Sequence, residues 1–260
     1  MTRASANRIF PAMADILVFG AHPDDAEFGM GASIVKFVRG GASVAVSVLT
    51  RGEAGTFGTP SQREKEMRAA AAKAGCELEI LSFHDCRIFD SYETRVRLAE
   101  VIRKFRPRIV FAPYHTNPSS HKDGGAHPDH TATGTIARSA CRYARFAGLK
   151  ELTGEPWNAE HLLYYMVPRS VRPNLVNDVT ANMEEWESIA RCHESQMNLR
   201  DGKVLEGLRR FRESYGALIG VAYAEAFYVE EPIVFDLAHF MTTSMQPGAV
   251  PPRGAPARAG

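Results

Sequence analysis

Two short motifs in this chain each gather histidine and aspartate side chains within four or five residues, a pattern typical of cation ligands. The first is AHPDD at residues 21–25, and the second is HPDH at residues 127–130. Carboxylates and imidazoles gathered this tightly repel or desolvate one another unless a positive ion lies among them. One imidazole and one carboxylate from the first motif, with one imidazole from the second, make a His/Asp/His set.

Three protein ligands with a fourth position left to water are typical of a catalytic zinc site rather than a structural one. The predicted ligands are His22, Asp25 and His130. The other members of the motifs then supply acid–base groups around the water, and these are Asp24, His127 and Asp129. Each motif alone has a simpler interpretation, because aspartate also caps helices and favours their first turn. The presence of two such motifs favours the metal.

Each motif follows an apolar run with the pattern of a buried strand. These runs are residues 15–20 before the first motif and residues 109–113 before the second. In an open α/β sheet, ligands bind outside the carboxyl ends of the strands. We therefore expect the two motifs to meet at one edge of a sheet.

Strand and helix patterns alternate along the rest of the chain. Helical spacing follows residue 31, and further helices are predicted at 61–74, from 90 or 91 to 106, and at 129–146, 182–196 and 204–218. Further strands are predicted at 43–49, 77–83, 160–167 and 174–179, with a last strand or strand pair within 227–235, and the strand before the second motif begins at about residue 108. This alternation predicts a single-domain, Rossmann-like doubly wound α/β fold with a mostly parallel sheet. No nucleotide is expected, because no G-x-G-x-x-G follows the first strand and its carboxylates would repel a pyrophosphate.

The amino-acid composition indicates where the folded domain begins and ends and which partner classes are not expected. Residues 1–12 are predicted to be an extension, residues 13–243 the domain, and residues 244–260 a disordered tail rich in Pro, Gly, Ala and Arg. The 31 basic and 30 acidic residues are interspersed, so neither nucleic acid nor an anionic membrane is an expected partner. Four cysteines without a C-x-x-C, and no apolar signal segment, indicate a cytoplasmic protein with reduced thiols. The oligomeric state, a homo-oligomer included, stays open.

These motifs resemble those of the PIG-L/LmbE-type zinc-dependent N-deacetylases. The resemblance extends to TRGE at 50–53, GTP at 58–60 with Arg63, HESQ at 193–196 and GVAYAEAF at 220–227. It covers roughly residues 13 to 237, and the C-terminal part is most similar to the branch that deacetylates N-acetylglucosaminyl-malate in bacillithiol biosynthesis. It implies a small amino-sugar conjugate as substrate, with acetate and a free amino sugar as products.

The resemblance also implies a role for each motif residue. Zinc lies on the three predicted ligands, although Fe²⁺ can occupy such a site. Asp24 takes the proton of the attacking water, and His127 stabilises the oxyanion or protonates the leaving amine. Asp129 holds the ring of His127. Two histidines of the polar loop at 114–126, His115 and His121, are set aside because the ligand set is already complete.

Several other residues have both a functional and a structural interpretation. By resemblance Tyr223 assists the oxyanion, and otherwise it is a half-buried structural tyrosine. Arg63 and Arg51 are candidates to grip the carboxylates of an anionic aglycone in a two-bond fork, although Arg63 can also pair with a glutamate of its own helix. His84 and Asp85 follow the third strand, at a strand end, and so could enter the pocket, although His84 is interpreted as a surface histidine. The histidine of HESQ is interpreted as a helix-packing residue.

Three alternative functions share these residues. The first is deacetylation of another N-acetylglucosamine conjugate, such as a chito-oligosaccharide, an inositol conjugate or a thiol conjugate. The second is a non-haem Fe(II) oxygenase, which also uses two histidines and a carboxylate, but no β-barrel of that class is predicted here. The third is a non-catalytic sugar-binding protein, against which Asp24 argues because a binder needs no base.

Overall fold

The computed structural model describes residues 13–118 and 127–233, and within them seven strands form one sheet. Its strand order is β3-β2-β1-β4-β5-β7-β6. The strands are β1 (Ile16–Gly20), β2 (Val44–Val48), β3 (Glu77–Ile80), β4 (Ile109–Pro113), β5 (His161–Tyr165), β6 (Leu175–Asp178) and β7 (Ala224–Val229). Strands β1 to β5 pair in parallel, whereas β7 runs antiparallel to both β5 and β6. The predicted mostly parallel, doubly wound α/β sheet is confirmed.

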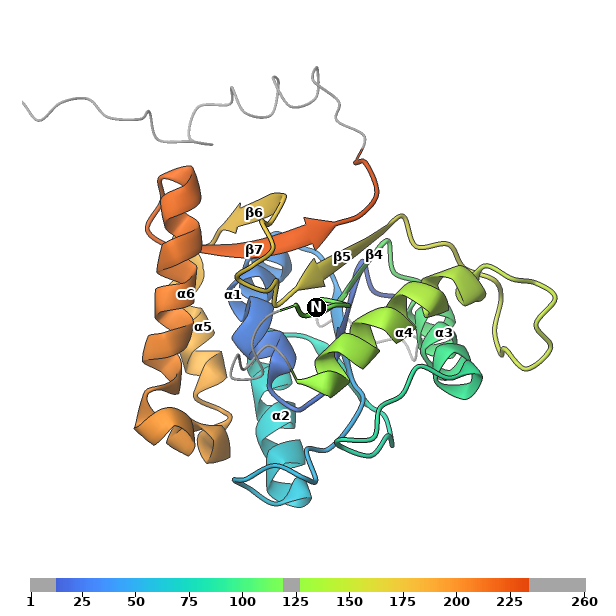
Figure 1. Cartoon of the computed structure of the whole chain (residues 1–260), viewed down its shortest axis with the longest axis horizontal. Coiled ribbons are helices and arrows are strands. Elements are labelled where there is room, and N and C mark those ends of the chain that lie inside the picture. Colours follow the sequence, from blue (N-terminus) through green and yellow to red (C-terminus); the bar gives the residue numbers. More distant parts are fainter. Residues whose placement is uncertain (1–12, 119–126, 234–260) are drawn as a thin grey trace, which may run out of the picture. The chain divides into compact units, whose positions relative to one another are not determined.

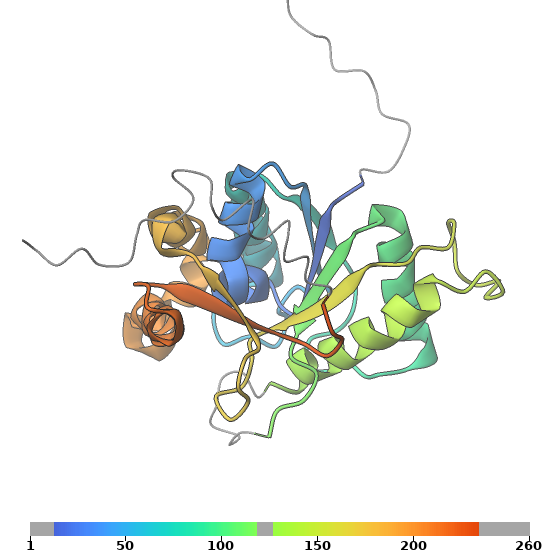
Figure 2. The ribbon, with the colours of Figure 1, turned by 90° about the horizontal axis from the view of Figure 1, so that it is seen from above.

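Helices cover both faces of this sheet. They are α1 (Asp25–Arg39), α2 (Pro60–Ala74), α3 (Tyr92–Phe105), α4 (Pro128–Ala144), α5 (Met183–Ala190) and α6 (Val204–Ile219), with short 3₁₀ helices η2 (Thr180–Asn182) and η3 (Glu194–Gly202). Figures 1 and 2 show α3 and α4 on one face and α1, α2 and α5 on the other. No helix in the described ranges is long and apolar enough to cross a membrane.

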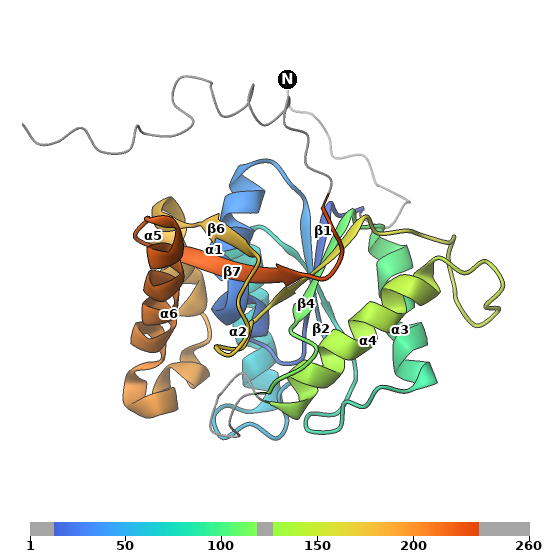
Figure 3. The same ribbon diagram turned by 45° about the horizontal axis from the view of Figure 1, so that its top comes forward.

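Successive side chains of a strand point to opposite faces of the sheet, so alternate residues of one strand pack against different helices. In β1, Leu17 and Phe19 pack with the α3 and α4 side chains, whereas Ile16 and Val18 pack with those of α1, α2 and α5. A strand buried on both faces has no polar face, which is why the sequence of β1 reads as a continuous apolar run. At the far edge, α6 packs against β7 (Figure 3).

The predicted ranges differ from the structure at several places, and the first helix begins at Asp25, well before the helical spacing predicted after residue 31. The strand at 77–83 ends at Ile80, and the helix at 182–196 ends at Ala190, after which the chain continues in η3. This earlier end lets the segment around His193 turn inward and become buried. The predicted last strand is β7, which begins at Ala224 rather than at 227. Pro232 and Ile233 are not in a strand, and residues 234–235 lie outside the described residues, as do residues 1–12, 244–260 and His121.

Helix α1, which begins inside the first motif, is broken at Met30 (φ −148°, ψ 20°). A break removes the helical partners of the preceding carbonyl groups, and distant side chains replace them. The indole Nε1 of Trp186 donates to the carbonyl oxygen of Glu27 at 2.8 Å. The guanidinium of Arg212 donates to the carbonyl oxygen of Phe28 at 3.1 Å and lies 3.8 Å above the Trp186 ring.

The second half of α1 is capped in the same way. The Glu225 carboxylate accepts from the backbone N–H groups of Ala32 (3.2 Å) and Ser33 (2.7 Å), as a capping residue does at a helix start. Arg212 donates its Nε–H to the same carboxylate at 2.8 Å, and both side chains are buried. Removing one partner of a buried pair costs about 3–5 kcal/mol because the other charge is left uncompensated. Elements from the C-terminal part of the chain therefore hold the helix that carries the first motif.

Candidate metal centre and its cavity

The predicted ligand atoms lie together at the carboxyl ends of β1 and β4. His22 Nδ1 is 3.2 Å from His130 Nε2, and the Asp25 carboxylate is 3.0 Å from His130 Nε2 and 3.6 Å from His22 Nδ1. Zinc bonds of 2.0–2.1 Å in a tetrahedron separate neighbouring ligand atoms by about 3.3 Å. The three measured separations lie around that value. The donor set therefore fits a small divalent cation without rearrangement.

Local backbone geometry explains why the motifs meet. β1 and β4 are neighbours in the sheet, so the segments that follow them leave from the same edge. Asp25 is the first residue of α1, and its Oδ2 accepts from the backbone N–H groups of Ala21 (2.8 Å) and His22 (2.9 Å). These bonds fold the first motif back on itself. His130 lies in the first turn of α4 and faces the same point.

A ring of carboxylates surrounds His22. Its Nε2 lies 3.2 Å from Asp85 Oδ1 and 3.4 Å from Asp129 Oδ2, on the side opposite the other ligand atoms. Burial by itself lowers the pKa of His22, but the charges of Asp25, Asp129 and Asp85 outweigh it and raise the pKa to about 12. The site thus favours positive charge on or beside this ring. When Nε2–H donates to carboxylates, Nδ1 is left free to bind a cation.

Asp24 is buried next to the ligand set and is not part of it. Its Oδ1 lies 3.4 Å from Arg63 Nη2. Burial raises the pKa of Asp24 above its ordinary value, against the opposing charge of Arg63 and with the help of Asp25. A carboxyl group with a raised pKa is a better proton acceptor near neutral pH. Arg63 also donates to the carbonyl oxygen of Gly52 at 3.3 Å. A Cβ added at Gly52 would lie 1.9 Å from the guanidinium, so the loop needs a glycine here to leave room for Arg63.

His127 precedes the first turn of α4 and faces the cavity. Its Nδ1 accepts from the backbone N–H of Asp129 at 3.2 Å, so the neutral ring carries its proton on Nε2. Burial lowers the pKa of His127, and the nearby rings of His22 and His130 lower it further. The side chain of Asp129 does not hold this ring, contrary to the expectation from the sequence. It accepts from the backbone N–H of Cys86 at 2.7 Å and contacts His22 instead.

Two of the predicted site residues lie elsewhere. Tyr223 does not line the cavity and packs beside the buried side chains of Trp186 and Met183, which agrees with its structural interpretation. Arg51 pairs with Glu64 and is also absent from the cavity lining. Arg63 does line the cavity, but it pairs with an aspartate of the first motif rather than with a glutamate of its own helix.

Asp85 is a site residue that sequence reasoning placed at a strand end near the pocket but to which it gave no role. It lines the cavity, and its Oδ2 accepts from the backbone N–H of Ala54 at 3.0 Å. The structure also brings His22, Asp85 and His127 within ligand distance of one another, as a second set around the same histidine. The only signal in the sequence is that Asp85 follows a predicted strand. His84, beside it, is exposed as predicted.

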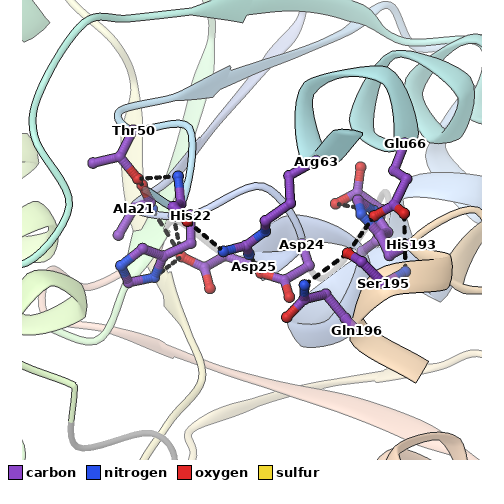
Figure 4. A network of polar contacts seen from close by, with 12 residues as sticks. Ala21, His22, Asp24, Asp25, Thr50, Arg63, Glu66, His193, Ser195 and Gln196 are labelled. Atoms are coloured by element: carbon purple, nitrogen blue, oxygen red, sulfur yellow. Dashed lines mark hydrogen bonds and ion pairs between the residues drawn. The ribbon is translucent and has the colours of Figure 1, made fainter. Parts of the chain in front are cut away.

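The HESQ segment contacts α2 and the loop that precedes it, and Figure 4 shows Ser195 and Gln196 beside Glu66 of α2. Ser195 donates its N–H (2.9 Å) and its hydroxyl (2.6 Å) to the carboxylate of Glu66, a buried residue of α2. Gln196 donates to the carbonyl oxygen of Phe57 at 2.9 Å. His193 is buried 3.5 Å from Glu27, which fits its packing interpretation.

The ligand set and the residues around it, Asp24, Arg63, Asp85 and His127 among them, line one cavity of about 530 Å³. The ligand set, Asp24, Arg63 and His127 form its inner end. Its outer wall consists mainly of apolar side chains from the segment after β5 and from α6. A volume of this size accommodates a ligand of one or two sugar rings.

Comparison with known proteins identifies the family to which the chain belongs. The family model of PIG-L, described as GlcNAc-PI de-N-acetylase, matches residues 17–141. The diacetylchitobiose deacetylase of Thermococcus kodakarensis is 31% identical over 237 residues, which cover 84% of each chain. The chain belongs to the PIG-L family.

Other members extend this similarity. A 1D-myo-inositol 2-acetamido-2-deoxy-alpha-D-glucopyranoside deacetylase of Saccharopolyspora erythraea is 26% identical over 259 residues, covering 85% of this chain and 90% of its own. The crystal structure of the conserved protein TT1542 from Thermus thermophilus superposes with a TM-score of 0.77 and 34% identity. It covers 86% of this chain and 98% of that one. The PIG-L similarity thus extends well beyond the two motifs.

Replacing Asp85 by alanine is expected to weaken metal binding by about 10–100-fold without abolishing it, because Asp85 holds a ligand ring rather than the ion. Metal affinity measured by competition with a chelating dye checks this expectation. Asp90→Ala, which removes an exposed carboxylate paired with Arg95, is the matched control and is expected to bind metal normally. Complete loss of metal in Asp85→Ala would instead favour the second set, in which Asp85 is itself a ligand.

Proposed function

We propose that this protein is a metal-dependent N-deacetylase that hydrolyses the acetamide of an N-acetylglucosamine conjugate to acetate and a free amine. The observation that carries the proposal is the placement of Asp24. It is a buried carboxyl group with a raised pKa, which faces the same cavity as a donor set with tetrahedral spacing. The names of two relatives, one acting on diacetylchitobiose and one on an inositol glucosaminide, support this substrate class.

The residues divide the reaction among them. His22, Asp25 and His130 would hold the ion, and when bound a divalent cation acidifies a water and polarises the acetamide carbonyl. Asp24 accepts the proton of the attacking water. His127 donates a hydrogen bond from Nε2 to the oxyanion that develops on the carbonyl oxygen. When the C–N bond breaks, Asp24 passes the proton that it accepted to the departing amine.

The proposed metal is zinc, and the proposed substrate within the class is N-acetylglucosaminyl-malate. Two nitrogen ligands and one oxygen ligand at tetrahedral separations support zinc, although Fe²⁺ accepts the same donors. The resemblance of residues 193–237 to the bacillithiol branch supports the malate conjugate. Diacetylchitobiose and the inositol conjugate are the substrates to compare with it.

A deacetylation screen tests the proposal. Protein stripped of metal and reloaded with Zn²⁺ or Fe²⁺ is incubated with the malate, inositol and chitobiose conjugates, and released acetate is measured. Turnover that depends on the added ion is the expected result, with the highest kcat/KM on the malate conjugate. Binding of the conjugates without any release of acetate would identify a sugar-binding protein and overturn the proposal.

A further inference from the structure

The cavity continues outward from the ligand set to a second hollow. Its outer wall includes residues 166–168, after β5, and the side chains of Leu208 and Phe211 from α6. A neighbouring groove of about 1090 Å³ shares Arg169, Phe211 and Tyr215 with the cavity. A ligand held at the inner end can therefore extend along the apolar wall into the groove.

The groove is cationic. Arg169, Arg172 and Arg210 line it, and no aspartate or glutamate of the described part of the chain does. Arg210 pairs with Glu206 on its own helix. Within residues 13–118 and 127–233, neither Arg169 nor Arg172 has an acidic partner. Two exposed guanidinium groups without counter-charges are left at this end of the cavity.

The other arginines of the cavity are already paired. Arg63 lies against Asp24 at the inner end, and Arg212 is buried against Glu225 beneath α1. Among the described residues that line the cavity, Arg169 is thus the arginine without an acidic partner. An anionic group on a ligand would find its counter-charge there.

The segment that carries these arginines is held in place. The guanidinium of Arg169 lies 4.6 Å above the ring of Phe211 on α6. From the same helix, the Tyr215 hydroxyl donates to the carbonyl oxygen of Val167 at 3.4 Å. Stacking restricts a guanidinium in advance, so less conformational freedom is lost when it binds an anion.

We propose that the aglycone of the substrate carries an anionic group, a carboxylate or a phosphate, which Arg169 and Arg172 bind where the cavity opens into the groove. The proposal rests on the proposed function, since the acetamide at the inner end fixes the direction in which the aglycone extends. A guanidinium fork matches the paired oxygens of either anion. N-acetylglucosaminyl-malate is one member of this class.

Paired synthetic conjugates test the proposal through binding, independently of turnover. N-acetylglucosamine is linked through alkyl spacers of increasing length to a phenyl ring bearing either a carboxylate or a carboxamide of the same shape. A third series carries a phosphate. Calorimetry on the full-length protein gives the Kd of each conjugate. We expect the carboxylate or the phosphate to bind roughly tenfold more tightly than the amide at the best spacer length, and high salt to reduce this ratio. Comparing the two anions identifies the preferred group.

Variants assign the preference to its residues. Arg169→Ala and Arg172→Ala are each expected to lower the anion-to-amide ratio, and Arg169→Glu to bring it below one. Arg191→Ala removes an exposed arginine that lines neither hollow and is expected to keep the ratio. A wild-type ratio near one at every spacer length overturns the proposal, as does a preference that survives in Arg169→Glu. Release of acetate from the amide series in that case would leave the proposed function standing.

Discussion

Alanine in place of His22, Asp25 or His130 is expected to remove bound metal and deacetylation together. Each change leaves two ligand atoms where three meet at 3.0–3.6 Å, which is too few to hold the ion at a catalytic site. The loss of metal affinity should exceed the roughly 100-fold that a residue beside the ligands costs. Metal content after gel filtration and released acetate measure the two losses.

Two controls separate this loss from misfolding. His84→Ala removes an exposed histidine beside the site and is expected to keep both metal and activity. Asp25→Asn keeps the side-chain size, which matters because Asp25 also accepts two backbone N–H groups of the first motif. Far-ultraviolet circular dichroism and melting temperature show whether each variant folds. Full metal occupancy in all three folded alanine variants would refute the ligand assignment.

The sheet could be predicted from the sequence because its signals are local. Buried strands such as β1 and β4 have a continuous apolar run, and the helices between them end at turn residues such as Gly75, whose φ is +73°. The break in α1 had no such signal. It depends on Trp186 and Glu225, which lie far along the chain and contact α1 only through the tertiary fold.

In the candidate site, too, some residues could be predicted from local sequence signals and others could not. His22 and His130 could be predicted to meet because each lies in a motif just after a strand of the same sheet. Asp85 lies in no motif and reaches His22 only through the connection that follows β3. The acidic partners of Arg63 and Arg51 could not be predicted from the sequence either. Arg63 pairs with Asp24 and Arg51 with Glu64, and both pairs depend on how the loop at 50–59 folds. The spacing of residues in the sequence predicts the ligands within one motif. Ion pairs between different helices, strands and loops depend on the three-dimensional fold and are not visible in the sequence.

Asp24→Asn is expected to keep metal but to lower kcat by roughly 10²–10⁴-fold, the usual effect of losing a general base. The amide has the same size as the carboxylate and cannot accept the proton of the attacking water. Asp24 is not a member of the ligand set, so metal affinity should change much less than in the variants of His22 or His130. Steady-state kinetics on the best conjugate, with metal content measured on the same sample, test both statements.

The Arg63 contact provides the control for this variant. The Asp24→Asn substitution would leave the Arg63 guanidinium without its carboxylate at 3.4 Å, so part of the loss could come from a displaced arginine rather than from the missing base. Arg63→Lys keeps a positive charge near Asp24 and is expected to reduce kcat less than Asp24→Asn does. If Asp24→Asn retained the activity of the parent, the base would lie elsewhere, and His127, whose lowered pKa keeps its ring neutral, would become the candidate. If both variants lost activity equally, the Asp24–Arg63 pair would act as one unit in which position matters as much as proton transfer.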